Sequence, residues 1–578
     1  MNQNLTVINE RVDDIPLLLA QLKRMGVQEL LDKHFPTHGN WQGLSLGWVT
    51  IIWLGHILSQ KDHRLNQVQS WSEKRLKTLR NLSFDSLRAL DFSDDRLEGV
   101  LRYLSKDESW FQFEQELGGN LIQVYDLSPE RVRLDSTTAS SYCGVNESGL
   151  FQWGHSKDHR PDLAQVKVML STLDPLALPV AIEVLAGHKA DDPLYIPAIS
   201  RVRETLARTG LLYIGDCKMA AIKTRAYLVA SKDYYLCPLS TTHLAKEELE
   251  RYLEPVWAGN KELTSVEYTY SHGETKEIAV GYERSQPHTI IVDGVEVSWI
   301  ERQLVVRSQA VAVSAEKSLR TRLDKAQFAL AQLGKPCRGK KRLKSLLEWQ
   351  EAAAATLARY RVSELLQLDY HEITKEHQLR RYGNRLAQSR VEKTVELCVT
   401  LNEAVLAHQL RLLGWRVYVT NQPQEQLTLA QAVVAYREEY LIERGFGRLK
   451  GFPLSLTPMY LLQAELQRDD HIKGLIRLLS LGLRVLTLLD FHVHRSLAVS
   501  QEKLSGLYSG NPKRSSARPT AEQLLGAFGD ITLVLIDINN HPIVHISPLS
   551  PLQKQILALL NFPIEIYSQL AALMFKPP

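Results

Sequence analysis

Two acidic residues come directly after runs of β-forming residues. Asp135 follows "RVRL" at 131–134, and Asp216 follows "LLYIG" at 211–215. If both strands lie side by side in the centre of a sheet, the two carboxylates emerge near one another at one edge. Two like charges at that distance must share a proton or be neutralised by a cation. A third acid from a helix over this edge would complete an oxygen-rich Mg²⁺ site, and Glu443 is the candidate.

The segment around Glu443 supports this interpretation. Tyr436, Glu443 and Lys450 are seven residues apart within a predicted helix at 428–451. Seven residues make nearly two helical turns, so the three side chains are expected to form one stripe. A phenol, a carboxylate and an ammonium on one face do not make a core. They would instead suit a polyanion held through a metal, with Tyr436 and Lys450 on flanking phosphates.

Each acid also has a simpler explanation. Asp135 could cap a turn before the "STTASS" run, and Asp216 could cap a helix that begins near Met219. Glu443 could be an ordinary acid on the surface of a helix. The metal-site hypothesis therefore depends on the three residues occurring together at two strand ends and one helix face.

The hydrophobic pattern predicts the elements that would position these residues. Residues 12–127 have helical periodicity, whereas the pattern from about 131 to 217 gives three strands, a helix and a fourth strand. The order β-β-β-α-β predicts a mixed sheet with a crossover onto a parallel neighbour. A long segment of different, strand-rich character follows, and the sheet is expected to resume at 415–421.

Composition places the chain among folded proteins of the cytoplasm. It has 578 residues, 44% hydrophobic and 23% charged, and its five cysteines form no CxxC pair. The apolar run at 46–58 is shorter than the roughly 20 residues needed to cross a bilayer, so a buried helix and no membrane contact are expected. Net charge is only +4, but four local basic clusters favour a phosphate-binding surface. They are residues 72–80, 338–344, 379–385 and 510–519.

Three stretches together resemble one known family. These are "LDSTTAS" with Asp135, "YIGDCKM" with Asp216, and "YREEYLIERGFGRLKG" with Tyr436, Glu443 and Lys450. They resemble the DDE-class insertion-sequence transposases, in the lineage with a Tyr-Arg-Glu-Lys signature and an insertion domain before the catalytic glutamate. The stretch "FQWGHSKDHRPDLAQVKVML" at 151–170 also resembles this family's linker into the second strand.

The resemblance implies an α/β fold: an RNase H-like mixed-sheet core, interrupted by a β-rich insertion domain, with helical N-terminal and C-terminal regions. The implied catalytic and metal-binding triad is Asp135, Asp216 and Glu443, with Mg²⁺ as cofactor and Mn²⁺ as a substitute. Two ions would support in-line cleavage at the element ends and transfer of the 3′ hydroxyls to target DNA. The implied domains are a DNA-binding region (1–127), two core parts (128–240 and 411–500), the insertion (241–410) and a tail (501–578).

The expected partner is double-stranded DNA, both terminal inverted repeats and target, bound by a synaptic homodimer in the cytoplasm and at the bacterial nucleoid. One position departs from the signature, because Glu439 stands where its arginine is expected. Arg437 or Arg444 could contact the phosphate instead. The departure leaves open a catalytically impaired DNA-binding descendant. An RNase H-like nuclease without strand transfer is another alternative, and a two-carboxylate glycosidase is disfavoured by the basic clusters.

Overall fold

The structure, a computed structural model, is of the mixed α/β class predicted from the sequence and contains a large mixed sheet. The chain forms two compact units: residues 1–237, 289–299 and 435–578 make the first, and residues 238–288 and 300–434 the second. The structure describes residues 5–83, 86–142, 144–145, 148–270, 273–292, 294–335, 343, 345–379, 388–457, 459, 469–538 and 541–572.

Helices make up most of residues 15–125 in the first unit. Helix α3 is buried on nearly every side, which confirms the buried helix predicted from its apolar run. Ser45 begins it by accepting a hydrogen bond from the Trp48 backbone N–H. The α-helices of this region are α1 (Ile15–Arg24), α2 (Val27–His34), α3 (Leu46–Gln60), α4 (Val68–Glu73), α5 (Leu76–Leu82), α6 (Asp94–Leu104) and α7 (Asp107–Tyr125).

The first unit also holds a run of five adjacent strands in the order β4-β3-β2-β5-β6. Strands β2, β3 and β4 are antiparallel, while β5 and β6 run parallel to β2 after helical crossovers. Side chains of β3 are buried along its whole length, so this part of the sheet is covered on both faces. The elements are β2 (Arg131–Ser141), β3 (Ala164–Leu173), β4 (Leu178–Ala186), α8 (Tyr195–Leu206), β5 (Leu212–Gly215), α9 (Ile222–Ala230) and β6 (Tyr234–Pro238).

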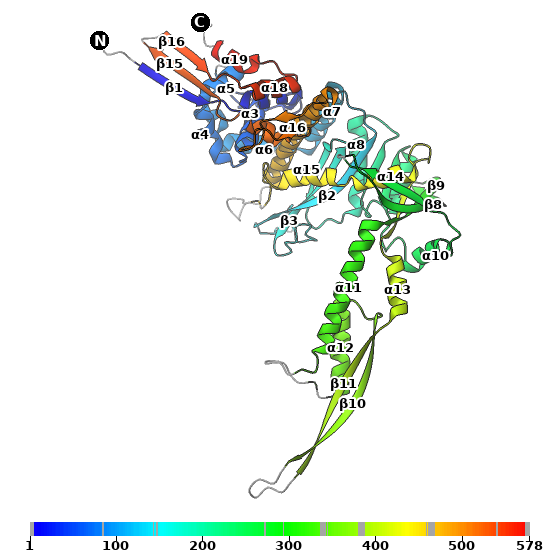
Figure 1. The fold of residues 1–578 in the computed structure, drawn as a ribbon. Helices are drawn as coiled ribbons and strands as arrows, with labels where there is room; N and C mark the ends of the chain where they lie inside the picture. The colour runs from blue at the N-terminus through cyan, green and yellow to red at the C-terminus, as the bar shows by residue number, and fades with distance from the viewer. Residues whose placement is uncertain are drawn as a thin grey trace. The chain divides into compact units, whose positions relative to one another are not determined.

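A long buried helix, α16 (Asp469–Ser500), packs against α6 and β4. At the α6 contact there is no room for a side chain, because a Cβ on Gly474 would lie 2.2 Å from the Leu101 carbonyl oxygen. Figure 1 shows the N-terminal strand beside two strands from the end of the chain. These strands are β1 (Leu5–Arg11), β15 (Thr532–Ile538) and β16 (His541–Ile546).

Shorter elements complete the C-terminal part of the first unit. Helix α17 starts with a capping box, in which the Thr520 hydroxyl and the Gln523 side chain satisfy each other's backbone N–H groups. The remaining elements are α15 (Tyr440–Lys450), β13 (Leu504–Ser505), β14 (Ser515–Ser516), α17 (Ala521–Gly526), α18 (Pro551–Leu559) and α19 (Glu565–Ala572).

The second unit combines strands in the order β12-β9-β8-β7 with a separate helical part that carries a two-stranded ribbon (Figure 1). Its helical part has its own apolar core, which includes Leu323, Ala326 and Ala353. Its elements are α10 (Lys246–Trp257), β7 (Thr264–Thr269), β8 (Thr275–Val292), β9 (Val295–Ser308), α11 (Gln309–Ala331), α12 (Leu346–Tyr360), β10 (Leu366–Leu379), β11 (Gln388–Leu401), α13 (Glu403–Leu412), β12 (Trp415–Thr420) and α14 (Leu429–Arg437). Residues 289–299 of β8 and β9, and residues 435–437 at the end of α14, belong to the first unit.

Within the described ranges, none of the helices is both long enough and apolar enough to span a bilayer.

Candidate active site

The register of the sheet brings Asp135 and Asp216 to one place. Strand β2 pairs in parallel with β5, and Leu134 lies opposite Gly215. Asp135 follows Leu134 and Asp216 follows Gly215, and neighbouring strands lie about 4.8 Å apart. The two carboxylates therefore lie on adjacent backbones where β5 ends. The predicted end of the first strand at Asp135 is wrong, because residues 136–141 go on pairing with β3 and β2 continues to Ser141.

The two acids have different surroundings. Burial raises the pKa of Asp135, as does the nearby charge of Asp216, and the ammonium of Lys157 opposes both effects. Asp216 accepts hydrogen bonds from the Tyr195 hydroxyl, at 2.7 Å, and from the Lys218 backbone N–H, at 2.8 Å. Tyr195 is the first residue of α8, and burial together with Asp216 raises its pKa well above the ordinary value. It therefore remains a proton donor to Asp216.

The predicted single helix at 428–451 is wrong, because the chain forms two helices there. Helix α14 ends at Arg437 and α15 begins at Tyr440. The guanidinium of Arg133, on β2, donates a hydrogen bond to the Ala435 carbonyl. The Glu439 N–H bonds instead to the Tyr436 carbonyl, three residues back, at 3.2 Å. This change from a four-residue to a three-residue step accounts for the interruption.

As a result, Tyr436 and Glu443 do not share one continuous helical stripe. Tyr436 belongs to α14, whereas Glu443 and Lys450 belong to α15. Tyr436 is buried, with 9% of its surface exposed, and Glu443 is exposed. The prediction that Tyr436 lies on one helical stripe with Glu443 and Lys450 is therefore wrong.

A small cavity of about 10 Å³ lies between the sheet edge and these helices. It has room for about one water-sized sphere. Its lining includes Asp135, Asp216, Tyr436 and Glu439. Burial raises the pKa of Glu439, and the charges of Asp135, Glu443 and Asp216 raise it further. Glu439, the residue that departs from the signature, thus faces the same space as the two aspartates.

The predicted phosphate-binding cations lie at different places. The Lys450 ammonium is 2.5 Å from an oxygen of Asp158. Arg444 lies 3.6 Å from Asp490 of α16, and Arg437 is the partly buried last residue of α14. Lys450 and Arg444 are therefore both paired with acids of the chain itself.

The donor set at the sheet edge fits a hard divalent cation in its chemistry. Asp135, Asp216 and Glu439 offer carboxylate oxygens around one cavity, and the mutual repulsion of these acids is the effect that a bound cation relieves. In the part of the chain that the structure describes, no three His, Cys, Asp or Glu side chains are grouped closely enough to hold a metal ion. The aspartates are thus brought together without a complete ligand cage.

Two residues of this site were missed by sequence reasoning. Tyr195 is one; the other is Lys157, whose ammonium lies 3.3 Å from an Asp135 oxygen. Lys157 lies in the stretch 151–170 that was singled out from the sequence, but no spacing rule connects it to Asp135. Only its place beside a family-like motif could have directed attention to it.

The basic clusters give a mixed result. Most of 338–344 and most of 379–385 lie outside the described residues. In cluster 72–80, Arg75 is buried against Trp71 and donates to its carbonyl. In cluster 510–519, Arg514 is exposed and lies over the Tyr508 ring. Of these two arginines, Arg514 has the exposure that DNA contact requires.

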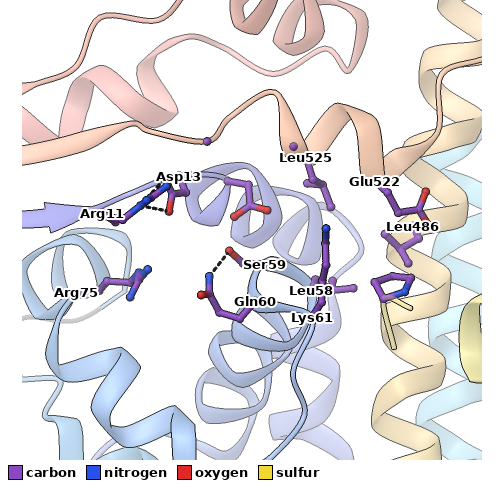
Figure 2. Close-up of a pocket in the computed structure, with 14 residues that line it drawn as sticks. Arg11, Asp13, Leu58, Ser59, Gln60, Lys61, Arg75, Leu486, Glu522 and Leu525 are labelled. Atoms are coloured by element: carbon purple, nitrogen blue, oxygen red, sulfur yellow. Dashed lines mark hydrogen bonds and ion pairs between the residues drawn. The ribbon is translucent and has the colours of Figure 1, made fainter. Parts of the chain in front are cut away.

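A separate cavity of about 310 Å³ lies among the end of β1, the residues that follow it, α3, α16 and α17 (Figure 2). Basic and acidic side chains both line it, and Arg11 is bound to Asp13 there. Burial raises the pKa of Asp14 in its wall to about 6. None of the predicted site residues lines this cavity.

Comparison with known proteins gives little similarity. No family model matches the chain, and no curated protein matches it. Among solved structures, it is similar to piggyBac transposase in a synaptic complex with hairpin DNA, at 11% sequence identity and a TM-score of 0.22. The match covers 49% of this chain and 60% of the other, which is less than two thirds of its length. At this TM-score the likeness carries no weight for fold or function.

Proposed function

We propose that the chain is a DNA transposase that cleaves phosphodiester bonds at the ends of an insertion element and joins the 3′ hydroxyl ends to target DNA. The observation that carries the proposal is the register of β2 and β5, which brings Asp135 and Asp216 together. Two carboxylates on neighbouring strands, Asp135 within β2 and Asp216 just after β5, beside a helix with further acids, suit phosphoryl transfer. The family resemblance of the same residues supplies the substrate class.

The topology supports an RNase H-like core. Three antiparallel strands are followed by two strands that run parallel to the first and join it through helices. This is the mixed sheet expected from the order of elements in the sequence. In this core the acids of the sheet and those of α15 belong to the same compact unit, although residues 238–434 separate them along the chain.

The proposed triad is Asp135, Asp216 and Glu443, and these residues would hold Mg²⁺, with Mn²⁺ as a substitute. A bound divalent cation supplies Lewis-acid stabilisation of the phosphate and a nucleophile at neutral pH. The chain itself holds the carboxylates in place. Tyr195 orients Asp216 through its hydrogen bond, and the strand register fixes Asp135 beside it.

DNA contact is assigned to the helical N-terminal region and to cations near the acids. Phosphate contacts of this kind position DNA without reading its sequence. Lys450 and Arg444 would exchange their contacts with Asp158 and Asp490 for phosphate oxygens. Tyr436 lines the cavity, and Arg437, the last residue of α14, would contact the phosphate from beside it. The two ends would be joined within a homodimer. We place the protein in the cytoplasm, at the nucleoid when it is bound to DNA.

A cleavage assay tests the proposal. A supercoiled plasmid that carries the DNA flanking the gene would be incubated with the full chain and Mg²⁺ or Mn²⁺. Metal-dependent nicking is expected from the natural chain and not from Asp135→Asn, while gel-shift binding of the same DNA persists in both. Equal nicking by the natural chain and the variant would refute the assigned site.

One observation favours a second candidate, a DNA-binding descendant with impaired catalysis. Glu439 brings another negative charge to the cavity that a phosphate would approach. DNA binding without metal-dependent nicking, restored by Glu439→Arg, would support it. A nuclease without strand transfer would cut the same plasmid but fail to join pre-cut 3′ ends to a second DNA.

A further inference from the structure

The connection between β2 and β3 carries a basic residue, Lys157, followed directly by an acidic one, Asp158. The Lys157 backbone N–H donates to the Thr138 hydroxyl at 3.0 Å, which attaches the segment to β2. Further along, the Gln165 side-chain amide donates to the His155 carbonyl at 3.0 Å. Asp158 binds the Lys450 ammonium of α15. The segment is thus attached on three sides.

The Lys157 ammonium is held mainly by the residue after Asp135. It donates to the Ser136 carbonyl at 2.6 Å and to the Ser136 hydroxyl at 2.9 Å. Ser136 is itself fixed, because its hydroxyl donates to Asp191 at 2.9 Å and Asp191 is paired with the buried Lys167 at 2.6 Å. Lys157 would therefore stay in place if Asp135 turned to another partner.

An ammonium has three N–H donors, and Ser136 uses two of those on Lys157. The third is directed at Asp135, whose oxygen is the most distant of the three acceptors at 3.3 Å. The Lys157 side chain is 28% exposed and that of Asp135 is 24% exposed, so solvent reaches the pair. This third donor is the one that a substrate can engage.

We propose that Lys157 is a further catalytic residue, whose ammonium donates to a non-bridging oxygen of the phosphate being cleaved at Asp135 and Asp216. The inference deepens the proposed function and rests on it. Several carboxylates around one cavity repel a phosphate, and a fixed cation beside them offsets that repulsion as charge develops. Within the described residues, Lys157 is the cation whose ion pair with Asp135 lies within 4 Å.

Lys450 is assigned to a flanking phosphate and not to this place, because its ion pair is with Asp158, whereas that of Lys157 is with Asp135 itself. The adjacent residues of the connection thus have separate tasks: Lys157 presents a charge at the acids, and Asp158 holds the α15 lysine. A lysine that merely balanced Asp135 until a metal arrived would compete with that metal. A lysine that binds phosphate would change the rate and leave the metal requirement unaltered.

The test compares Lys157→Met, Lys157→Arg and Lys189→Met in the plasmid-nicking assay, with Asp135→Asn alongside. Lys189 is an exposed lysine on the turn after β4 and controls for general loss of positive charge. At saturating Mg²⁺, Lys157→Met should lower the single-turnover rate about 100-fold, the lower end of the loss typical of removing one hydrogen-bond donor to a transition state. Lys157→Arg should recover part of the rate, and Lys189→Met should remain near the natural value.

Two further readouts separate the outcomes. The Mg²⁺ concentration at half-maximal rate should change less than twofold in Lys157→Met, and the melting temperature should show that the variant is folded. A full rate in Lys157→Met, or an unchanged maximal rate reached at lower Mg²⁺, would overturn the inference. If Asp135→Asn also nicked the plasmid normally, the proposed function itself would fail.

Discussion

The hydroxyl of Tyr195 donates a hydrogen bond of 2.7 Å to Oδ1 of Asp216. Because burial and Asp216 hold the pKa of Tyr195 far above the working range, this donor persists at any pH at which the protein is folded. The same oxygen accepts the Lys218 backbone N–H, and Asp216 lines the cavity that it shares with Asp135. Tyr195 is thus a positioning residue for the proposed site.

Tyr195→Phe should lower the rate of DNA nicking and raise the Mg²⁺ concentration required, each by roughly tenfold or more, since a hydrogen bond to a charged group contributes about 1.5–3 kcal/mol. DNA binding should be unchanged. Tyr227→Phe is the matched control, because it removes a hydroxyl contact to Ser200 of the same helix at 2.6 Å and touches no acid of the site. Equal losses in both variants would indicate a structural effect of α8.

The contributions of Glu443, within α15, and Glu439, at its N-terminal cap, to metal-dependent nicking can be compared in the same assay. Glu443→Gln should abolish nicking if Glu443 belongs to the triad. Glu439→Gln should raise the Mg²⁺ requirement about tenfold and leave the maximal rate within a few-fold, because Glu439 adds charge to the cavity without completing the triad. The reverse pattern, with Glu439→Gln inactive and Glu443→Gln active, would transfer the third position to Glu439.

The two strands that carry Asp135 and Asp216 were predictable from the sequence because their signal is local, although β2 continues six residues beyond its predicted end at Asp135. An alternating run, "RVRL", precedes Asp135 and a continuous apolar run, "LLYIG", precedes Asp216, and the helix between the third and fourth strands requires a crossover. These features together lead to the register in which Leu134 lies opposite Gly215. The contacts of Tyr195 with Asp216 and of Lys157 with Asp135 follow no sequence periodicity and could not be predicted in this way.

Other features depend on residues far apart in the chain. Arg133 interrupts the helix at Glu438 and Glu439 through a carbonyl contact from β2, about 300 residues away in sequence. Helix periodicity is continuous across this point, so the pattern alone predicts one helix. The pairing of β1 with β15 is similar, since Leu5 lies opposite Ile538 and no local signal relates them.

Asp14 makes stability depend on pH. It is 6% exposed, and burial raises its pKa to about 6 from an ordinary value of 3.8. The folded chain therefore binds more protons than the unfolded chain between these values, and stability falls as pH rises from about 4 through 6. Above pH 6, the buried Asp14 carboxylate lowers the free energy of unfolding by on the order of 2–3 kcal/mol.

Asp14→Asn removes this cost, so its melting temperature should exceed that of the natural chain at pH 7–8 and equal it near pH 4. Differential scanning calorimetry across this range measures the difference. Asp13→Asn is the neighbouring control, since Asp13 is paired with Arg11 at 3.0 Å and its loss should not stabilise the chain at high pH. A gain in Asp14→Asn that is the same at pH 4 and pH 8 would contradict the assignment.

Arg484 of α16 and Glu114 of α7 form a pair in which each side chain is 1% exposed, with atoms 2.5 Å apart. Arg484→Met leaves the Glu114 carboxylate buried and, among the residues that the structure describes, paired with Arg201 alone, at 3.3 Å. The free energy of unfolding should therefore fall by about 3–5 kcal/mol. Chemical denaturation would measure this loss for the first unit.

The double variant Arg484→Met with Glu114→Gln separates the pair from general packing. Because neither charge is then left alone, its loss of stability should be smaller than the sum of the two single losses by at least about 1 kcal/mol. Arg320→Ala, which breaks the exposed pair with Glu316 in α11, should cost less than about 0.5 kcal/mol. Strict additivity in the double variant would mean that the two buried charges contribute independently, because a coupled pair cannot give additive losses.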